Sequence, residues 1–209
     1  MAAFRAAIDA GVGIECDLRL SRDGFAMVFH DVSLERLCGL DVEPESLHAA
    51  ALMHFRLDRS DERIPWLGDL LDLIDGRVPL MLEPKKSSSG SPIDHLCRAT
   101  LKALHAYRGP VAVISFEARV GNWFADHAPA IRRGLILDGR DPFFLRIAKL
   151  WSSQATLVAV QADSIARPWV AALRRSGRDI CCWTVRTVAQ RETAAVHADA
   201  LIWEADGRP

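Results

Sequence analysis

Short apolar runs alternate with amphipathic segments along most of the chain, most regularly after residue 110. Continuous apolar runs of four to eight residues are typical of strands buried on both faces of a parallel sheet. The segments between them repeat apolar residues at helical spacing. The predicted strands are the two runs within residues 14–31, then 78–82, 111–116, 134–137, 156–161, 179–185 and 200–203. The predicted helices are residues 1–10, 66–74, 93–107, 119–127, 142–151, 168–175 and 188–196.

This order predicts an α/β fold, a TIM (β/α)8-type barrel that lacks its first strand, in a single domain over residues 1–209. Seven strands of the parallel type follow the opening helix, where a complete barrel has eight. A doubly wound sheet is the alternative. Polar or aromatic residues at successive strand ends favour the barrel, whose strand ends converge on one mouth; they are Glu15, Asp17, Glu83, Lys85, Ser115 and Trp183. Residues 32–64 are long for a loop and predict short helical turns or a binding loop.

Composition excludes several classes of protein. The formal net charge is -1 with no long block of one sign, which argues against a nucleic-acid binder or an anionic-membrane binder. No apolar run approaches the ~20 residues that span a bilayer, so stable membrane insertion is not expected. Met1 is followed by a helical pattern and not by a signal peptide, which favours a cytoplasmic location. No GxGxxG or GxxxxGK[ST] loop suggests a nucleotide.

The five cysteines are odd in number and show no CxxC spacing, so we expect reduced thiols. Cys181 and Cys182 fall in one apolar run, where one should face inward and the other outward. Five of the tryptophans are expected to pack between helices and barrel: residues 66, 123, 151, 169 and 203. The histidines other than His30 are expected to be surface or structural residues.

Glu15 and Asp17 lie two apart in an apolar run, so on a strand their side chains share one face. Glu83 and Lys85 repeat this spacing at the end of a later strand. Three carboxylates without cysteine or histidine form a hard oxygen site, which suits one divalent cation, Mg²⁺ or Ca²⁺, better than Zn²⁺. Lys85 beside such a site would suit a phosphate.

His30 ends the second apolar run and is a natural proton donor or acceptor. A cation, a lysine and a histidine together indicate metal-assisted attack on a phosphate ester. Each signal also has a plain structural interpretation: a solvated strand face for Glu15 and Asp17, a structural histidine, and a solvated loop for Glu83 and Lys85. Their joint placement at strand ends favours the functional interpretation.

The chain resembles the glycerophosphodiester phosphodiesterase family from Phe4 to about Pro209. The resemblance lies in the segments AAFRAAIDAG, IECDLRLSRDG, VFHDVSLERLCG, IPWLGDLLDLI, VPLMLEPK, VISF and CWTV. It implies a TIM barrel that hydrolyses small-molecule glycerophosphodiesters to sn-glycerol 3-phosphate and an alcohol, a reaction of lipid and glycerol metabolism.

The resemblance also assigns roles to single residues. It implies that Glu15, Asp17 and Glu83 bind the divalent cation and that His30 is one of two catalytic histidines. It implies that the substrate is bound by Lys85, at the phosphate, and by the aromatic residues Phe116 and Trp183, which line the pocket.

The sequence departs from the family pattern at its start. Family members begin with a strand that ends in His-Arg-Gly, followed by Glu-Asn-Thr, whereas here Met1 falls where the next helix begins. We therefore expect an N-terminally truncated domain without the first catalytic histidine, with impaired activity and a tendency to unfold or self-associate through open strand edges.

Two other functions stay open. One is a phospholipase D that cleaves lysophospholipids on the same barrel. The other is a barrel that binds a phosphate ligand without turnover. The sequence leaves the oligomeric state, the alcohol moiety and the choice between Ca²⁺ and Mg²⁺ undecided.

Overall fold

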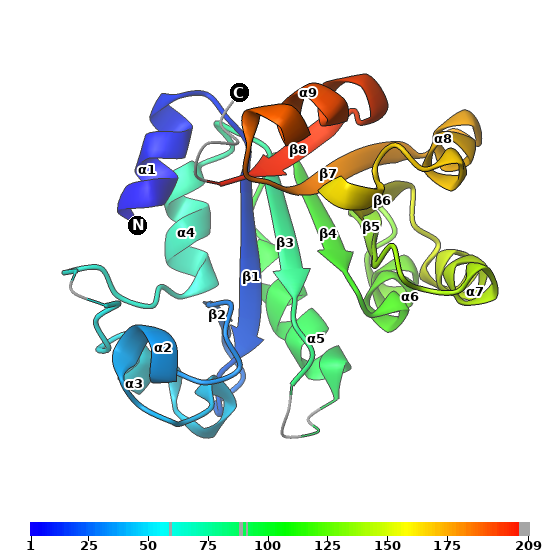
Figure 1. The fold of residues 1–209 in the computed structure, drawn as a ribbon. Coiled ribbons are helices and arrows are strands. Elements are labelled where there is room, and N and C mark those ends of the chain that lie inside the picture. Colours follow the sequence, from blue (N-terminus) through cyan, green and yellow to red (C-terminus); the bar gives the residue numbers. More distant parts are fainter. Residues whose placement is uncertain (59, 88–89, 91, 205–209) are drawn as a thin grey trace. The chain divides into compact units, whose positions relative to one another are not determined.

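Parallel strands and helices alternate in the computed structural model, which describes residues 1–58, 60–87, 90 and 92–204 (Figure 1). The chain divides into two compact units, Met1–Val113 and Ile114–Pro209. The predicted α/β class is confirmed, because the pairs β1–β3, β3–β4, β5–β6, β6–β7 and β7–β8 are all parallel. Strand–helix alternation of this kind is that of a TIM barrel. The single-domain assignment stays a prediction.

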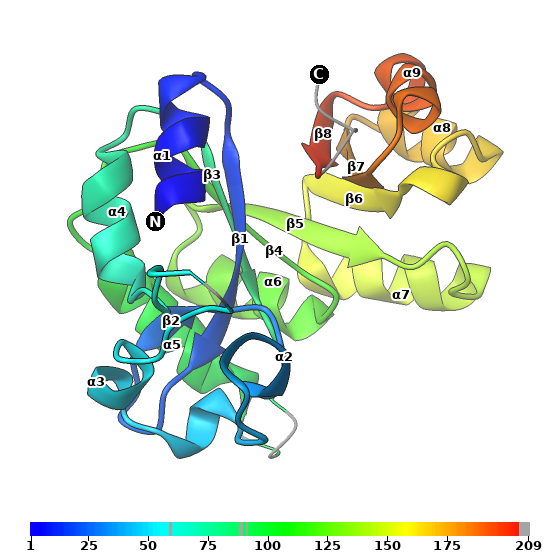
Figure 2. The same ribbon diagram turned by 60° about the vertical axis from the view of Figure 1, so that its left-hand side comes forward.

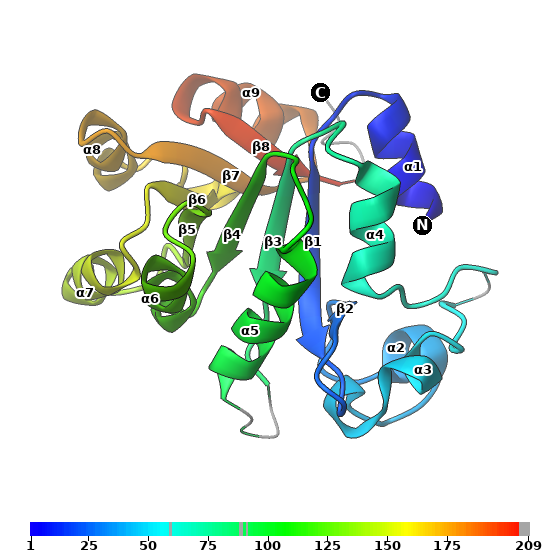
Figure 3. The ribbon, with the colours of Figure 1, turned by 180° about the vertical axis from the view of Figure 1, so that it is seen from behind.

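The first unit holds strands in the order β2-β1-β3-β4, with β2 antiparallel to β1. Helix α5 covers β1 and β3, and α1 packs against α4 (Figure 3). Its elements are α1 (Ala2–Asp9), β1 (Ile14–Leu20), β2 (Ala26–Val28), α2 (Glu35–Cys38), η1 (Pro44–Ser46), α3 (Ala49–Leu52), α4 (Leu67–Ile74), β3 (Leu80–Pro84), α5 (Ile93–Leu104) and β4 (Val111–Ser115), whose last residues belong to the second unit.

The second unit carries its strands in the order β5-β6-β7-β8. Helices α6 and α7 lie side by side next to β5 (Figure 2). Its elements are α6 (Ala118–His127), β5 (Arg132–Leu137), α7 (Phe143–Ser153), β6 (Leu157–Gln161), η2 (Ala162–Ser164), α8 (Pro168–Arg175), β7 (Asp179–Val185), α9 (Val188–His197) and β8 (Ala200–Trp203).

A tight turn between β1 and β2 places His30 just after the hairpin. The N–H of Ser21 donates to the carbonyl of Phe25 over 2.9 Å, and Gly24 adopts a φ of 84°. Only glycine takes that left-handed conformation at no steric cost, so the Asp-Gly pair fixes the reversal. The predicted hairpin is confirmed.

The described part of residues 32–64 contains short helices, as predicted, and packs on an apolar cluster that includes Met27 and Phe29. Met27, Phe29, Leu34, Leu52 and Ile64 are each at most 4% exposed there. This buried cluster anchors the segment against β2 and holds the loop after His30 in place.

One sequence prediction needs correction, and it concerns a tryptophan. Cys181 and Cys182 are both buried, as expected of neighbouring residues on a strand that is covered on both faces. Trp151 is 87% exposed, so it is not a packing residue. All five cysteines are free thiols, as expected. Among the described residues, no helix has both the length and the apolar character that crossing a bilayer requires.

Candidate metal centre and active site

The pairing of β1 with β3 brings the three predicted ligands together. Asp17 is the register partner of Glu83, and Glu15 lies two residues earlier on the same face of β1. One carboxylate oxygen from each of the three residues lies within 4.8 Å of the others. Strand pairing therefore converts two separate i, i+2 patterns into a single oxygen cluster.

Lys85 completes this cluster from the end of β3. Its Nζ lies 3.0 Å from Oδ1 of Asp17 and 2.7 Å from Oε1 of Glu83. The side chains of Lys85, Asp17 and Glu83 are each less than 20% exposed, so water screens these charges weakly. The four predicted residues thus form one charged group with a formal charge of about -2 when all are ionised.

Crowding and burial disfavour that charge. Burial, followed by repulsion from Asp17 and Glu83, raises the pKa of Glu15 to about 8. Burial also raises the pKa of Glu83 to about 7, against the opposing effect of Lys85. Burial lowers the pKa of Lys85, but its two carboxylate partners outweigh that effect and the net shift is upward. Such a group takes up positive charge readily, whether protons or a cation.

His30 is an exposed residue whose ring is oriented by its neighbour. Its Nδ1 lies 2.8 Å from Oδ1 of Asp31. Arg36 donates to both oxygens of Asp31, from Nε over 2.7 Å and from Nη2 over 3.0 Å. The hydrogen bond from Arg36 is the main cause that lowers the pKa of Asp31, so Asp31 is a carboxylate and can only accept. Nδ1 therefore carries a hydrogen, and Nε2 is free to exchange a proton.

The sequence pattern did not single out Asp31, Arg36 or Arg19. The guanidinium of Arg19 donates to the carbonyl of His30 and, over 2.8 Å, to the carbonyl of Lys86. Arg19 lies on the same face of β1 as Asp17. Arg19 is only 4% exposed. A charged residue two positions after Asp17 in an apolar strand was the available signal. Through these hydrogen bonds, Arg19 connects the segment that follows Lys85 to the segment that carries His30.

Phe116 and Trp183, the predicted aromatic residues, lie in the second unit and contact each other. Their ring centroids are 5.3 Å apart at an angle of 89°, an edge-to-face contact. The Nε1 of Trp183 is buried and has no hydrogen-bond acceptor within the part of the chain that the structure describes. A buried indole N–H of this kind can donate to an oxygen of a ligand.

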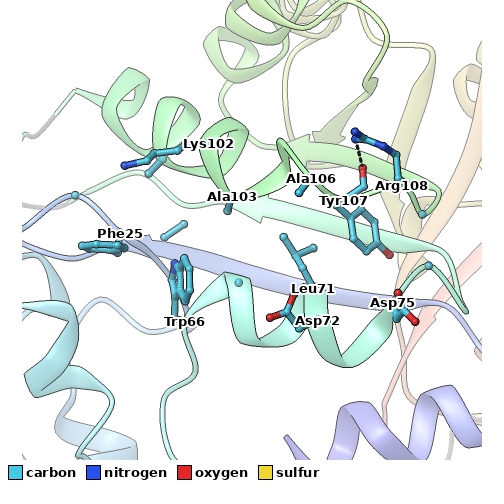
Figure 4. A pocket seen from close by; sticks show the side chains of 16 residues that line it. Phe25, Trp66, Leu71, Asp72, Asp75, Lys102, Ala103, Ala106, Tyr107 and Arg108 are labelled. Carbon is cyan, nitrogen blue, oxygen red and sulfur yellow. Dashed lines mark hydrogen bonds between the residues drawn. The ribbon is translucent and has the colours of Figure 1, made fainter.

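A cavity of about 550 Å³ in the first unit involves none of these residues (Figure 4). It runs between α4 and α5, with Phe25 and Trp66 near one end and Tyr107 and Arg108 near the other (Figure 4). It is thus distinct in its residues from the carboxylate cluster.

Comparison with known proteins identifies a family and a fold. Residues 1–207 match the model of the "Glycerophosphoryl diester phosphodiesterase family". A search of curated proteins finds no match. Solved structures share the fold at low sequence identity. One is an Oleispira antarctica phosphodiesterase in complex with the product sn-glycerol-3-phosphate, with 19% identity and a TM-score of 0.88 over 99% of this chain and 87% of that one.

Two further structures are glycerophosphodiester phosphodiesterases. The one from Thermotoga maritima has 21% identity and a TM-score of 0.79 over 97% of this chain and 86% of that one. The one from Agrobacterium tumefaciens has 21% identity and a TM-score of 0.71 over 98% and 89% of the two chains. These matches show the fold, and the match to the family model extends over nearly the whole chain. The chain therefore belongs to the glycerophosphoryl diester phosphodiesterase family, whose members are phosphoric diester hydrolases.

Proposed function

We propose that the chain hydrolyses glycerophosphodiesters to sn-glycerol 3-phosphate and an alcohol, with one divalent cation held by Glu15, Asp17 and Glu83. The observation that carries this proposal is the convergence of three carboxylates within 4.8 Å, with Lys85 against two of them. The product bound to the Oleispira antarctica relative supports sn-glycerol 3-phosphate as the shared product.

The donor set fits Mg²⁺ or Ca²⁺. Both are hard cations that prefer carboxylate oxygens, and the cluster offers no sulfur or imidazole ligand. Burial and then repulsion from Asp17 and Glu83 raise the pKa of Glu15, and a cation at this position would offset both effects. When bound, it would supply positive charge against the phosphate oxygens of the substrate.

The remaining residues divide the other tasks. Lys85, already held beside Asp17, binds a phosphate oxygen as a point charge. His30 transfers a proton at Nε2 to or from the oxygens of the displacement at phosphorus. Phe116 and Trp183 form an edge-to-face aromatic pair, here called the aromatic wall, whose chemistry suits the organic part of a substrate. Water forms the new P–O bond as the bond to the alcohol breaks and the alcohol oxygen takes up a proton. If a hydroxyl of the substrate attacks first, it forms a cyclic phosphate, which water must then open to give sn-glycerol 3-phosphate.

We expect slow turnover by these 209 residues, because only one of the two catalytic histidines implied by the family, His30, has a counterpart in them. Removing one acid/base group costs roughly 10²–10⁴ in rate. The first test is therefore cation binding, which does not require turnover.

Calorimetric titration of Mg²⁺ and of Ca²⁺ into the chain should show one site. Glu15→Gln and Glu83→Gln should each weaken binding at least about tenfold, whereas Glu192→Gln, at an exposed position on α9, should leave it unchanged. Glycerophosphocholine hydrolysis is measured in parallel, with lysophosphatidylcholine as the competing substrate. Equal affinities of the wild type and both cluster variants would refute the proposed ligands, and faster cleavage of lysophosphatidylcholine would favour a phospholipase D.

A further inference from the structure

Helix α7 carries an apolar stripe that faces solvent. Phe143, Phe144, Ile147 and Trp151 are 69%, 73%, 48% and 87% exposed. Spacings of one, four and eight residues from Phe143 place these side chains on one face of the helix. A surface helix normally exposes polar residues opposite its buried side, whereas α7 buries Leu150 and also exposes this second apolar stripe. Contiguous exposed apolar side chains of this size mark an interaction surface.

The charged residues of α7 are directed toward the rest of the second unit. Arg146 places its guanidinium carbon 4.5 Å from the ring centre of Trp169 and donates to the carbonyl of Asp141 over 2.9 Å. Lys149 pairs with the carboxylate of Asp141 over 2.7 Å. Helix α7 contains no acidic residue. Lys149 is thus paired with a carboxylate and Arg146 is held against Trp169 within the unit, and the exposed stripe itself contains no charged residue.

The stripe combines large and small side chains, as helix packing requires. Ala148 is exposed, four residues after Phe144 and three before Trp151, so a small side chain lies between two large rings. A ring from a facing helix can enter such a gap, as ridges enter grooves at helix–helix contacts. Two copies of one stripe placed antiparallel offer each other both a ring and a gap, which is the self-complementarity of a twofold interface.

The exposed area is of the right order for such a pair. An aromatic side chain buries 150–250 Å² when covered. At the exposures of Phe143, Phe144 and Trp151, three rings offer roughly 350–550 Å² per copy. A standard interface buries about 800 Å² per partner. The stripe thus supplies about half, in the form of an apolar centre, and the polar residues around it would form the rim.

We propose that the exposed stripe of α7, residues Phe143, Phe144, Ile147 and Trp151, is a homodimer interface that packs against the same stripe of a second copy. A second copy fits better than an anionic membrane. Surface-bound amphipathic helices hold to anionic lipid through free Lys and Arg, whereas Arg146 and Lys149 are occupied inside the unit. An uncharged partner is required, and the chain itself provides one.

Sedimentation equilibrium of the 209-residue chain tests the proposal over roughly 1–100 µM. The mass should rise with concentration from 23.1 kDa toward twice that value. Trp151→Glu and Phe144→Glu should each weaken the association at least tenfold. The matched control is Val196→Glu, because Val196 on α9 is also exposed, at 68%, but lies outside the stripe. Circular dichroism checks that each variant is folded.

A wild type that stays at 23.1 kDa throughout would overturn the proposal. So would association that persists in both α7 variants, since that points to open strand edges or another surface. Flotation with phosphatidylcholine vesicles tests the remaining alternative, that the stripe binds a lipid surface. Vesicle binding that is lost in Trp151→Glu, by a chain that does not dimerise, would assign the stripe to a lipid surface and overturn the dimer.

Discussion

The guanidinium of Arg19 holds the main-chain carbonyl of His30 through two hydrogen bonds, of 3.2 Å from Nε and 3.0 Å from Nη2. Its other arm holds the carbonyl of Lys86, 67 residues away in sequence. The carboxylate of Glu45, whose side chain is 8% exposed, lies 3.8 Å from the same guanidinium. One side chain therefore sets the relative position of the proposed acid/base residue and the strand end that carries Lys85.

Replacing Arg19 with Met should destabilise the chain by about 3 kcal/mol, because it leaves a buried carboxylate and two carbonyls without their donor. The loss of stability in Arg19→Lys should be smaller than in Arg19→Met, since lysine keeps the positive charge but lacks the several N–H donors of the planar guanidinium. Urea unfolding measures both, with Arg22→Met at an exposed position of the same hairpin as the control. A loss in Arg19→Met no larger than in Arg22→Met would show that Arg19 is dispensable.

Asp31→Asn should slow glycerophosphodiester hydrolysis roughly 10- to 100-fold, because the amide no longer fixes the His30 tautomer. Mg²⁺ affinity should not change, since Asp31 is not among the three clustered carboxylates. Steady-state kinetics measures the hydrolysis rate and calorimetry measures the Mg²⁺ affinity, and only the rate should change. Asp41→Asn, exposed in the same loop segment, is the control. An unaltered rate in Asp31→Asn would mean that Asp31 does not assist His30.

Stability in chelator should fall as pH rises from about 4.5 to about 8. The pKa of Glu15 rises from 4.5 to about 8 on folding, and that of Glu83 to about 7. In this window the folded chain binds protons that the unfolded chain has released, so raising the pH favours unfolding. The two shifts together correspond to several kcal/mol over this range, so thermal melts between pH 5 and pH 8 should show a fall of roughly 10–20 °C.

The Glu15→Gln variant isolates this effect, because an amide does not titrate. Its melting temperature should decline less over the same pH range than that of the wild type. Parallel pH curves for the two proteins would contradict the upward shift assigned to Glu15.

Lys85→Met should strengthen Mg²⁺ binding while weakening hydrolysis. Removing a positive charge near the carboxylates relieves repulsion of about 1 kcal/mol at 4 Å even at the dielectric constant of water, which is at least about fivefold in affinity. Turnover should fall because the phosphate loses its point charge. Lys102→Met, exposed on α5, is the control for both measurements. Weaker Mg²⁺ binding by Lys85→Met would instead show that Lys85 organises the carboxylates.

Gly121→Ala should destabilise the packing of α6 on α7 by roughly 1–3 kcal/mol. A Cβ at Gly121 would lie only 2.4 Å from the carbonyl oxygen of Ser153. That oxygen belongs to the backbone and cannot swing aside. Denaturant unfolding measures the loss, and Asn122→Ala, exposed on the same helix, is the control. A Gly121→Ala variant as stable as the wild type would mean that α6 and α7 move apart freely.

The candidate site was predictable where one strand alone defined it. Two-residue spacing placed Glu15 and Asp17 on one face, and the end of an apolar run placed Glu83 and Lys85 at a strand end. That Asp17 lies opposite Glu83 was not predictable, because register depends on how two distant strands pair. Strand 78–82 was also placed too early, since β3 continues through Glu83 and Pro84.

The side chains that support the site were harder to predict. Nothing in the sequence shows that Arg19 turns back onto the carbonyl of His30, since main-chain acceptors carry no residue identity. The orientation of α7 was likewise missed. Its apolar residues occupy most of the helix circumference, so periodicity does not select the buried side, and Trp151 was assigned to the wrong one.

Glu15, Asp17, Glu83 and Lys85 all belong to Met1–Val113, as does His30. A ligand stabilises the part of a chain that must be ordered to bind it, by an amount that grows with concentration. Cation binding by Glu15, Asp17 and Glu83 should therefore slow amide hydrogen exchange in β1 and β3 while leaving β6 and β7 unchanged. Exchange kinetics would then distinguish loading of the metal centre from events at the aromatic wall, strand by strand.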